Sequence, residues 1–158
     1  MKQIIGENKQ WIDETWKKLD AKLSRTAVKS RNKLPYTTIN GVHDDKSGHD
    51  SPWWTNGFWG GMMWLMYQAT GNEDYRRTAQ RSEELLDEAF YQFDRLHHDV
   101  GFMWHILSGA LYRLTGDEKS KNRNLLAAAS LASRFVLGGN YIRAYLDPGA
   151  QLLAYSEA

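Results

Sequence analysis

The turn Thr70-Gly71-Asn72-Glu73 recurs 45 residues later as Thr115-Gly116-Asp117-Glu118, and this repeat decides the fold. In each copy the glycine ends one helix and the following Asn or Asp caps the next. The similarity extends to both sides of the turn, with Trp59 aligned on Trp104, Met66-Tyr67 on Leu111-Tyr112 and Phe90 on Phe135. A fixed period of this length predicts repeated helical hairpins.

Hydrophobic periodicity predicts an all-α chain of about five helices around these two turns. An unpaired first helix covers residues 3–23, and each hairpin pairs an apolar inner helix with a charged outer one. The first hairpin spans about 55–69 and 72–93, and the second spans 99–114 and 117–136. In the first inner helix Gly57, Gly60 and Gly61 allow a neighbouring backbone to approach closely, which predicts a buried helix.

Such hairpins cannot bury their inner helices alone, so they need neighbours in a superhelical stack or a closed ring. A third inner helix is expected within residues 139–158, where it stops after about two turns. The apolar edge left open would require self-association or a further part of the fold to cover it. The apolar faces predicted to point inward include, on the first and last helices, Trp11, Ile12, Trp16, Leu19, Leu125 and Leu126.

Composition indicates one domain and excludes several classes of protein. The 158 residues carry 20 Lys and Arg against 19 Asp and Glu, a net charge of +1, so no global field attracts nucleic acid or an anionic membrane. The chain has no cysteine, which excludes disulfides and thiol chemistry. Without a signal-like or membrane-spanning apolar stretch, the protein is expected to be cytoplasmic.

A long irregular loop is predicted over residues 24–51, where Pro35 and the pair Asn40-Gly41 break any periodicity. Loops of this length inside a compact domain are often functional. This one leads into an aromatic cluster between Trp53 and Trp64. These rings either pack the core or form a platform on which a sugar stacks.

The candidate active site is the stretch from Leu96 to Trp104, which places Asp99 beside His97 and His98 at the start of an apolar helix. An aspartate here either caps the helix or, with imidazoles nearby, performs acid-base chemistry. Metal binding is not expected, because adjacent histidines on a helix diverge by about 100°. No cofactor is expected either, since the glycines of residues 57–61 follow a loop and not a strand.

Four motifs in order resemble the unsaturated glucuronyl hydrolases, glycoside hydrolase family 88, over about residues 3–145. They are Trp54-Thr55-Asn56-Gly57-Phe58-Trp59-Gly60-Gly61, Thr70-Gly71-Asn72-Glu73-Asp74-Tyr75-Arg76, His97-His98-Asp99-Val100-Gly101-Phe102 and Asn140-Tyr141-Ile142-Arg143-Ala144. The resemblance implies the N-terminal portion of an (α/α)6 barrel of the six-hairpin glycosidase type, with residues 146–158 an atypical, truncated tail.

The same resemblance implies the chemistry. Family members hydrate the C4=C5 bond of the terminal unsaturated uronic acid in oligosaccharides that lyases release from glycosaminoglycans. Asp99 matches the first of two active-site aspartates, and Trp54 matches a tryptophan that stacks on the substrate. Substrate contacts are also expected from His98, Asn56 and Trp59.

The second aspartate of the family is not found in its usual context, and Asp147 precedes Pro-Gly and is not assigned to that role. The chain alone is therefore expected to be inactive, as a fragment or truncated copy of such a hydrolase. The alternative is a non-catalytic carbohydrate-binding or helical oligomerisation module. The sequence leaves both interpretations open.

Overall fold

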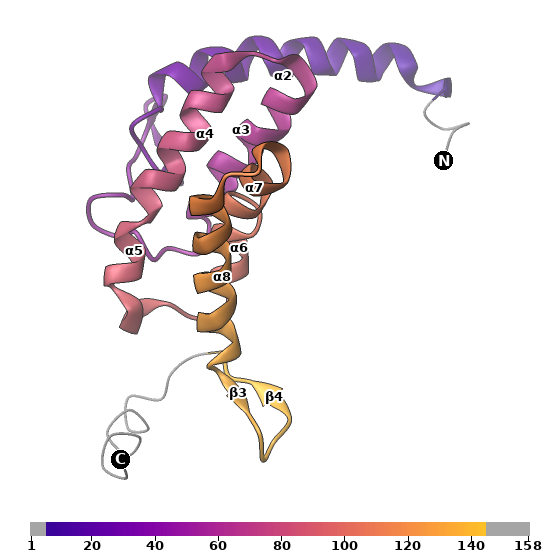
Figure 1. The fold of residues 1–158 in the computed structure, drawn as a ribbon. Coiled ribbons are helices and arrows are strands. Elements are labelled where there is room, and N and C mark those ends of the chain that lie inside the picture. Colours follow the sequence, from indigo (N-terminus) through magenta and orange to yellow (C-terminus); the bar gives the residue numbers. More distant parts are fainter. Residues whose placement is uncertain (1–5, 145–158) are drawn as a thin grey trace.

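The structure, a computed structural model, describes residues 6–144 as an open arc of helices with two short β-hairpins (Figure 1). The elements are α2 Lys9–Lys29, β1 Thr38–Ile39, β2 Val42–His43, α3 Asn56–Thr70, α4 Glu73–Leu86, α5 Glu88–Tyr91, the 3-10 helix η1 Phe93–Arg95, α6 Val100–Trp104, α7 Ser108–Thr115, α8 Glu118–Ala132, β3 Phe135–Val136 and β4 Tyr141–Ile142. No described helix is long and apolar enough to cross a membrane.

Both repeated turns have the predicted construction. Gly71 and Gly116 adopt the left-handed conformation, with φ of 70° and 75°, at the ends of α3 and α7. The side chain of Asn72 then accepts the backbone N–H of Asp74 at 2.9 Å. In the second copy Asp117 accepts the N–H of Ser120 at 2.8 Å. The hairpins α3–α4 and α7–α8 are therefore confirmed.

The glycines of α3 set how closely it packs on α6 and the turn after it. A Cβ atom added to Gly57 would lie 2.1 Å from the carbonyl oxygen of Met103, and one added to Gly60 would lie 2.3 Å from Cδ1 of Leu107. Only glycine allows this approach. The predicted buried inner helix is confirmed, and its neighbourhood holds the largest fully buried side chains, among them Trp64, Trp104 and Met63.

The predicted helix over 99–114 is divided in two. The chain leaves the helix after Trp104 and resumes it at Ser108. The turn between them places Leu107, which is fully buried, against Gly60. Packing against α3 therefore overrides the continuous helical periodicity. The predicted outer helix over 72–93 is likewise divided, at Asp87, into α4 and α5.

The end of the second hairpin differs most from the prediction. Instead of an outer helix that reaches Val136, β3 and β4 form an antiparallel pair with Phe135 opposite Ile142 and Val136 opposite Tyr141. The third inner helix was predicted within residues 139–158, of which 145–158 lie outside the described residues. Asn140 has a φ of 52°, as a tight turn requires. Apolar β-formers on both sides of a Gly-Gly-Asn turn favour a β-hairpin. Asp147 and the predicted tail 146–158 lie outside the described residues.

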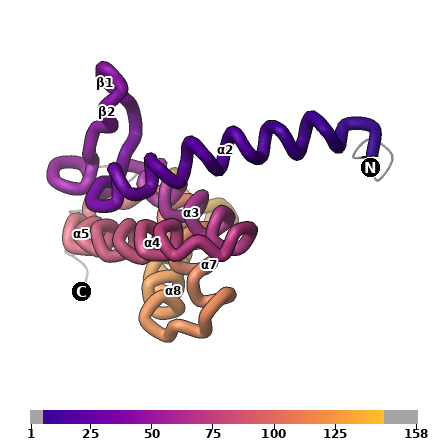
Figure 2. Tube along the Cα trace, turned by 90° about the horizontal axis from the view of Figure 1, so that it is seen from above, coloured from indigo at the N-terminus to yellow at the C-terminus, as the bar shows by residue number. Residues whose placement is uncertain are grey.

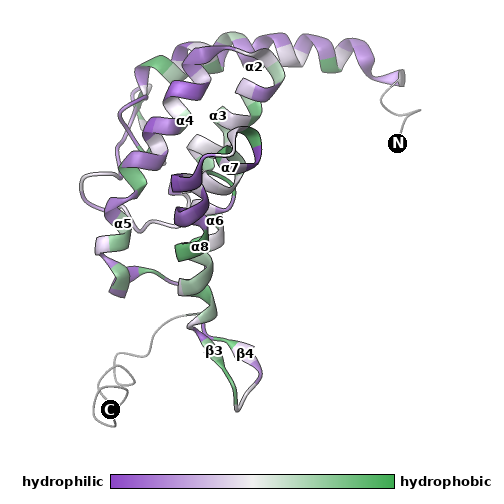
Figure 3. Cartoon of the chain, viewed as in Figure 1, coloured by the Kyte–Doolittle hydropathy of each residue, from purple (hydrophilic) through white to green (hydrophobic). Residues whose placement is uncertain are grey.

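Two apolar surfaces predicted to be inward are exposed. The N-terminal half of α2 extends away from the other helices (Figures 1 and 2), and Trp11 there is 66% exposed. Leu125 and Leu126 on α8 are also exposed, and Figure 3 shows the hydrophobic C-terminal half of that helix. Among residues 6–144 both surfaces are thus apolar and largely open to solvent.

The connection between α2 and α3 is ordered by its own hydrogen bonds. Helix α2 extends to Lys29, further than predicted, and Asn40-Gly41 forms the turn between β1 and β2 with φ of 52° and 75°. The carboxylate of Asp44 accepts the backbone N–H groups of Tyr36 and Thr37 at 2.8 and 2.7 Å. The loop is thus a fixed wall beside α2 and α3.

Candidate functional site

Asp99 stands at the N-cap position of α6, yet its side chain makes no capping hydrogen bond. Its carboxylate instead lies between two imidazoles, 3.3 Å from Nδ1 of His97 and 3.4 Å from Nε2 of His98. The side chain is 20% exposed. Capping therefore does not occupy this carboxylate, and a group held between two imidazoles at partial exposure can exchange a proton with a ligand.

The two histidines have different environments. Nδ1 of His98 lies 2.9 Å from the carbonyl oxygen of Ala144. Because a carbonyl only accepts, this nitrogen carries a proton, and Nε2 faces Asp99. Burial lowers the pKa of His97, the Asp99 carboxylate opposes this shift, and the charges of His98 and Arg134 lower the pKa further. His97 is accordingly neutral at pH 7.

The residues after β4 complete this corner of the molecule. The backbone N–H of His98 donates to Ala144 at 3.3 Å. The guanidinium of Arg134, which is buried, donates to the carbonyls of Leu96 and Ala144. The β3–β4 hairpin therefore anchors the His-His-Asp segment, a role that sequence reasoning missed because it expected helix there.

Three exposed aromatic rings stand next to this segment, and we call Trp54, Phe58 and Phe102 the aromatic shelf. They are 37%, 39% and 48% exposed. Trp54 meets Phe58 and Phe102 edge-on at 6.0 and 6.1 Å between ring centroids, while Phe58 and Phe102 stack at 5.8 Å. The backbone N–H of Phe102 donates to the backbone carbonyl oxygen of Asp99 at 2.8 Å, so this shelf residue lies in the first helical turn after Asp99.

The remaining predicted site residues, Asn56 and Trp59, are almost fully buried at 1% and 5% exposure. The amide of Asn56 donates to the carbonyl oxygens of Asp50 and Ser51 at 3.0 and 2.9 Å, so it fastens the loop to α3. Trp59 packs edge-on against His43 at 6.1 Å. Both have structural roles here, and their contact with substrate stays a prediction. The structure brings His98 to the Asp99 carboxylate, and it brings Trp54 to Phe102 of the helix that follows Asp99.

A metal ion was not expected, on the ground that adjacent histidines diverge on a helix. His97 and His98 precede α6 and are not helical, and each offers a ligand atom that lies with that of Asp99 within 4.8 Å. The three donors can thus converge on one ion. The positive charge of Arg134, which lowers the pKa of His97, disfavours a cation at the same place.

An open trough begins at the aromatic shelf and runs between α2, the loop and α3. Its volume is about 710 Å3, and its apolar wall includes Trp54, Phe58 and Met62. Lys22, Thr26 and His43 line it as well. A concave surface that combines aromatic and other apolar side chains with polar groups is typical of a small-molecule site.

Comparison with known proteins gives one consistent likeness. The chain is 36% identical over 102 residues to the unsaturated glucuronyl hydrolase of Bacillus sp. (strain GL1) and 33% identical over 101 residues to the unsaturated chondroitin disaccharide hydrolase of Streptococcus pneumoniae. These matches cover 64% and 63% of this chain, and 27% and 26% of the relatives. No family model matches the chain.

Solved structures agree. The Bacillus sp. GL1 unsaturated glucuronyl hydrolase superposes with a TM-score of 0.66 at 30% identity, over 80% of this chain and 33% of that one. The enzyme of Streptococcus agalactiae gives 0.62 at 26% identity, over 82% and 34%. The chain is therefore similar, in sequence and in its helical fold, to part of the unsaturated glucuronyl hydrolases. It spans about a quarter to a third of the length of these relatives.

Proposed function

We propose that this chain carries one part of a site for unsaturated uronic-acid oligosaccharides, in which Asp99 is an acid-base group. The observation that carries the proposal is the position of its carboxylate, which makes no capping bond and lies 3.3 Å and 3.4 Å from two imidazoles. The aromatic shelf includes Phe102, which lies in the first turn of the helix that Asp99 precedes. Likeness to the unsaturated glucuronyl hydrolases supplies the substrate class.

The names of the relatives support that class. One is an unsaturated chondroitin disaccharide hydrolase, and related enzymes have been solved with dGlcA-Glc-Rha-Glc and with dGlcA-GalNAc6S. Trp54 and its two partner rings would receive the face of the unsaturated ring, because sugars offer C–H groups to aromatic surfaces. His98 would border the Asp99 carboxylate, with its Nε2 at 3.4 Å.

The reaction is hydration of the C4=C5 double bond. A proton is added at C4, the oxygen of water is added at C5, and the water's remaining proton passes to a base. The hemiketal formed at C5 then opens and releases the next sugar. A carboxyl group has to give a proton to C4 and a carboxylate has to accept one from water, and the resemblance to the hydrolases implies two aspartates for this work.

Within residues 6–144, Asp99 is the carboxylate at this corner, and no second one takes part in the His-His-Asp cluster. We therefore expect binding of the unsaturated sugar by this chain without turnover. The exposed surfaces of α2 and α8 would be covered by the remainder of a barrel or by a second copy of the chain. A cytoplasmic location is part of the same proposal.

Ultraviolet absorbance of an unsaturated chondroitin disaccharide tests the function, because hydration removes the conjugated double bond. The chain should leave the absorbance unchanged and should bind the disaccharide in a calorimetric titration. Turnover by the parent chain that disappears in Asp99→Asn would refute the proposal that this chain holds only one part of the site. Such turnover would mean that the chain alone supplies acid-base catalysis, which contributes about 10²–10⁴-fold to a rate.

The second candidate function is that of a non-catalytic carbohydrate-binding module. The exposure of the aromatic shelf favours it, since such a surface stacks any sugar. Titration with the saturated disaccharide separates the two candidates. Equal affinity for the saturated and unsaturated ligands indicates a general binding module, whereas preference for the unsaturated ring supports a site built for the hydrolase substrate.

A further inference from the structure

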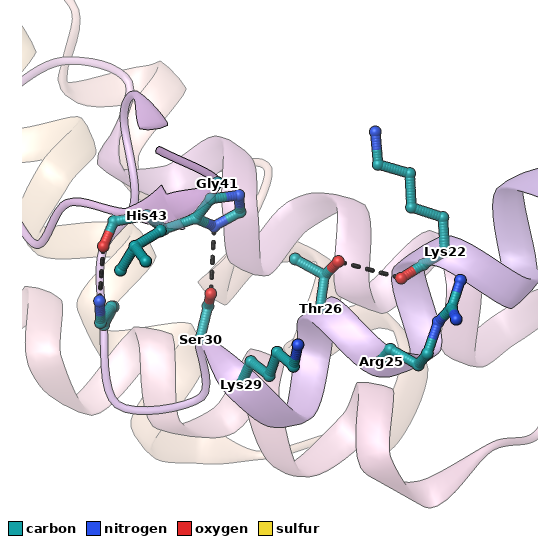
Figure 4. Close-up of a pocket in the computed structure, with 9 residues that line it drawn as sticks. Lys22, Arg25, Thr26, Lys29, Ser30, Gly41 and His43 are labelled. Carbon is teal, nitrogen blue, oxygen red and sulfur yellow. Dashed lines mark hydrogen bonds between the residues drawn. The ribbon is translucent and has the colours of Figure 1, made fainter. Parts of the chain in front are cut away.

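A second hollow lies on the other side of the trough wall, and we call it the basic hollow (Figure 4). Its volume is about 340 Å3, and it is bounded by the C-terminal half of α2 and by the turn between β1 and β2. Four cationic side chains line it, together with two hydroxyls and one imidazole: Lys22, Arg25, Lys29, Lys33, Thr26, Ser30 and His43.

No acidic side chain lines the basic hollow. Among the described residues, Lys22, Arg25 and Lys29 form no ion pair, and the Nε of Arg25 donates only to the backbone oxygen of Ala21. Lys33 donates to the backbone oxygen of His43 at 2.5 Å. Several positive charges gathered without counter-charges repel one another, and an anion in the hollow would relieve that repulsion.

The wall of the basic hollow is fixed. The Ser30 hydroxyl lies 3.1 Å from Nδ1 of His43, a contact drawn in Figure 4, and the His43 ring packs against buried Trp59. Lys33 holds the backbone of the same residue. The β1–β2 turn is therefore tied to α2 from two directions, which preorganises the hollow for a ligand.

The basic hollow and the trough share three lining residues, Lys22, Thr26 and His43. A ligand seated on Trp54 and Phe58 at one end of the trough can therefore extend toward the cations at the other. A sugar chain that has an apolar ring face and carries anionic groups matches this arrangement of aromatic rings and cations. An isolated small anion would use the basic hollow alone.

We propose that the basic hollow binds a sulfate ester on the oligosaccharide whose unsaturated end occupies the aromatic shelf. This inference rests on the proposed function, because the shelf sets the position of the ligand. The sulfate takes charge-assisted hydrogen bonds from the guanidinium of Arg25 and the ammonium of Lys29. The hollow thereby selects sulfated over unsulfated chains.

The test is calorimetry with two unsaturated chondroitin tetrasaccharides of equal length, one sulfated and one chemically desulfated. The parent chain should bind the sulfated ligand about tenfold more tightly, with a difference that shrinks as salt rises. Arg25→Gln/Lys29→Gln should abolish the preference. The control Lys17→Gln/Lys18→Gln, which removes the same charge from exposed positions of the same helix, should keep it.

The outcomes separate this inference from the proposed function. Equal affinity of the parent for both tetrasaccharides, or an equal loss in the control variant, would overturn the sulfate site and leave the proposed function standing. A parent that binds neither ligand would overturn both. Unchanged circular dichroism and Tm establish that each variant is folded, since all four side chains are on the helix surface.

Discussion

Substituting Gly57 by Ala tests whether close approach of α3 and α6 holds both the core and the site together. The new Cβ would lie 2.1 Å from the carbonyl oxygen of Met103 and 2.3 Å from that of Phe102. Both atoms belong to the backbone, so neither can rotate away. Overpacking of this kind costs about 1–3 kcal/mol, and the helix gains only about 0.5–1 kcal/mol from replacing glycine.

We therefore expect Gly57→Ala to lower the free energy of unfolding by about 1 kcal/mol, which corresponds to a fall in Tm of roughly 2–4 °C for a chain of this size. Calorimetry or thermal denaturation followed by circular dichroism measures it. Because α6 begins directly after Asp99 and carries Phe102, displacement of the helix should also weaken sugar binding.

Gly101→Ala is the matched control. Gly101 is also helical, and a Cβ added there meets nothing within 4 Å. Its substitution should stabilise the chain by about 0.5–1 kcal/mol. A Tm for Gly57→Ala that equals or exceeds that of Gly101→Ala would refute the close packing of α3 on α6.

Three further predictions concern the shelf, a cap and a buried carboxyl. Trp54→Ala should leave Tm nearly unchanged, because the ring is partly exposed, and should weaken disaccharide binding about threefold to tenfold by calorimetry; unaltered affinity would exclude the shelf. Asp117→Ala should cost about 1 kcal/mol in urea unfolding at pH 7. The Ser120 N–H holds the pKa of Asp117 below its usual value, so this difference should shrink as pH falls through that lowered pKa, and a constant difference would contradict the cap. Burial raises the pKa of Glu83, against the hydrogen bond from Ser120 and the charge of Arg123. The contribution of Glu83 to stability is fully present below the ordinary pKa of a glutamate and is lost as pH rises through the raised pKa. Glu83→Gln should therefore make the urea midpoint of unfolding less dependent on pH across that range. Glu84→Gln, at an exposed position, should leave the pH dependence unchanged.

Local signals in the sequence predicted most of the helical framework. Gly71 and Gly116 end helices in the left-handed conformation, and Gly57 and Gly60 lie very close to neighbouring residues. Both features were predictable because each depends on the backbone conformation or size of a single residue. The break before Ser108 was not predictable from periodicity, since it depends on how Leu107 packs against α3. The exposure of Trp11 was not predictable either, because it depends on whether another part of the fold packs on α2.

The site was predictable in part for the same reason. Asp99 and Trp54 stand in recognisable local motifs, and the structure brings both to one corner. The partner of His98 is Ala144, 46 residues away, in a hairpin that replaced an expected helix. The basic hollow combines residues of α2 with His43 of strand β2, so no single stretch of sequence displayed it.

Equilibrium dialysis of an unsaturated chondroitin disaccharide, read at the absorbance of its conjugated double bond, tests the central claim most directly. One reading reports binding, as excess absorbance on the protein side, and turnover, as loss of total absorbance. The claim that Asp99 and the aromatic shelf form one part of a sugar site predicts an excess that Trp54→Ala removes, with the total unchanged. No excess with the folded parent chain, or a total that falls with the parent and not with Asp99→Asn, would contradict it.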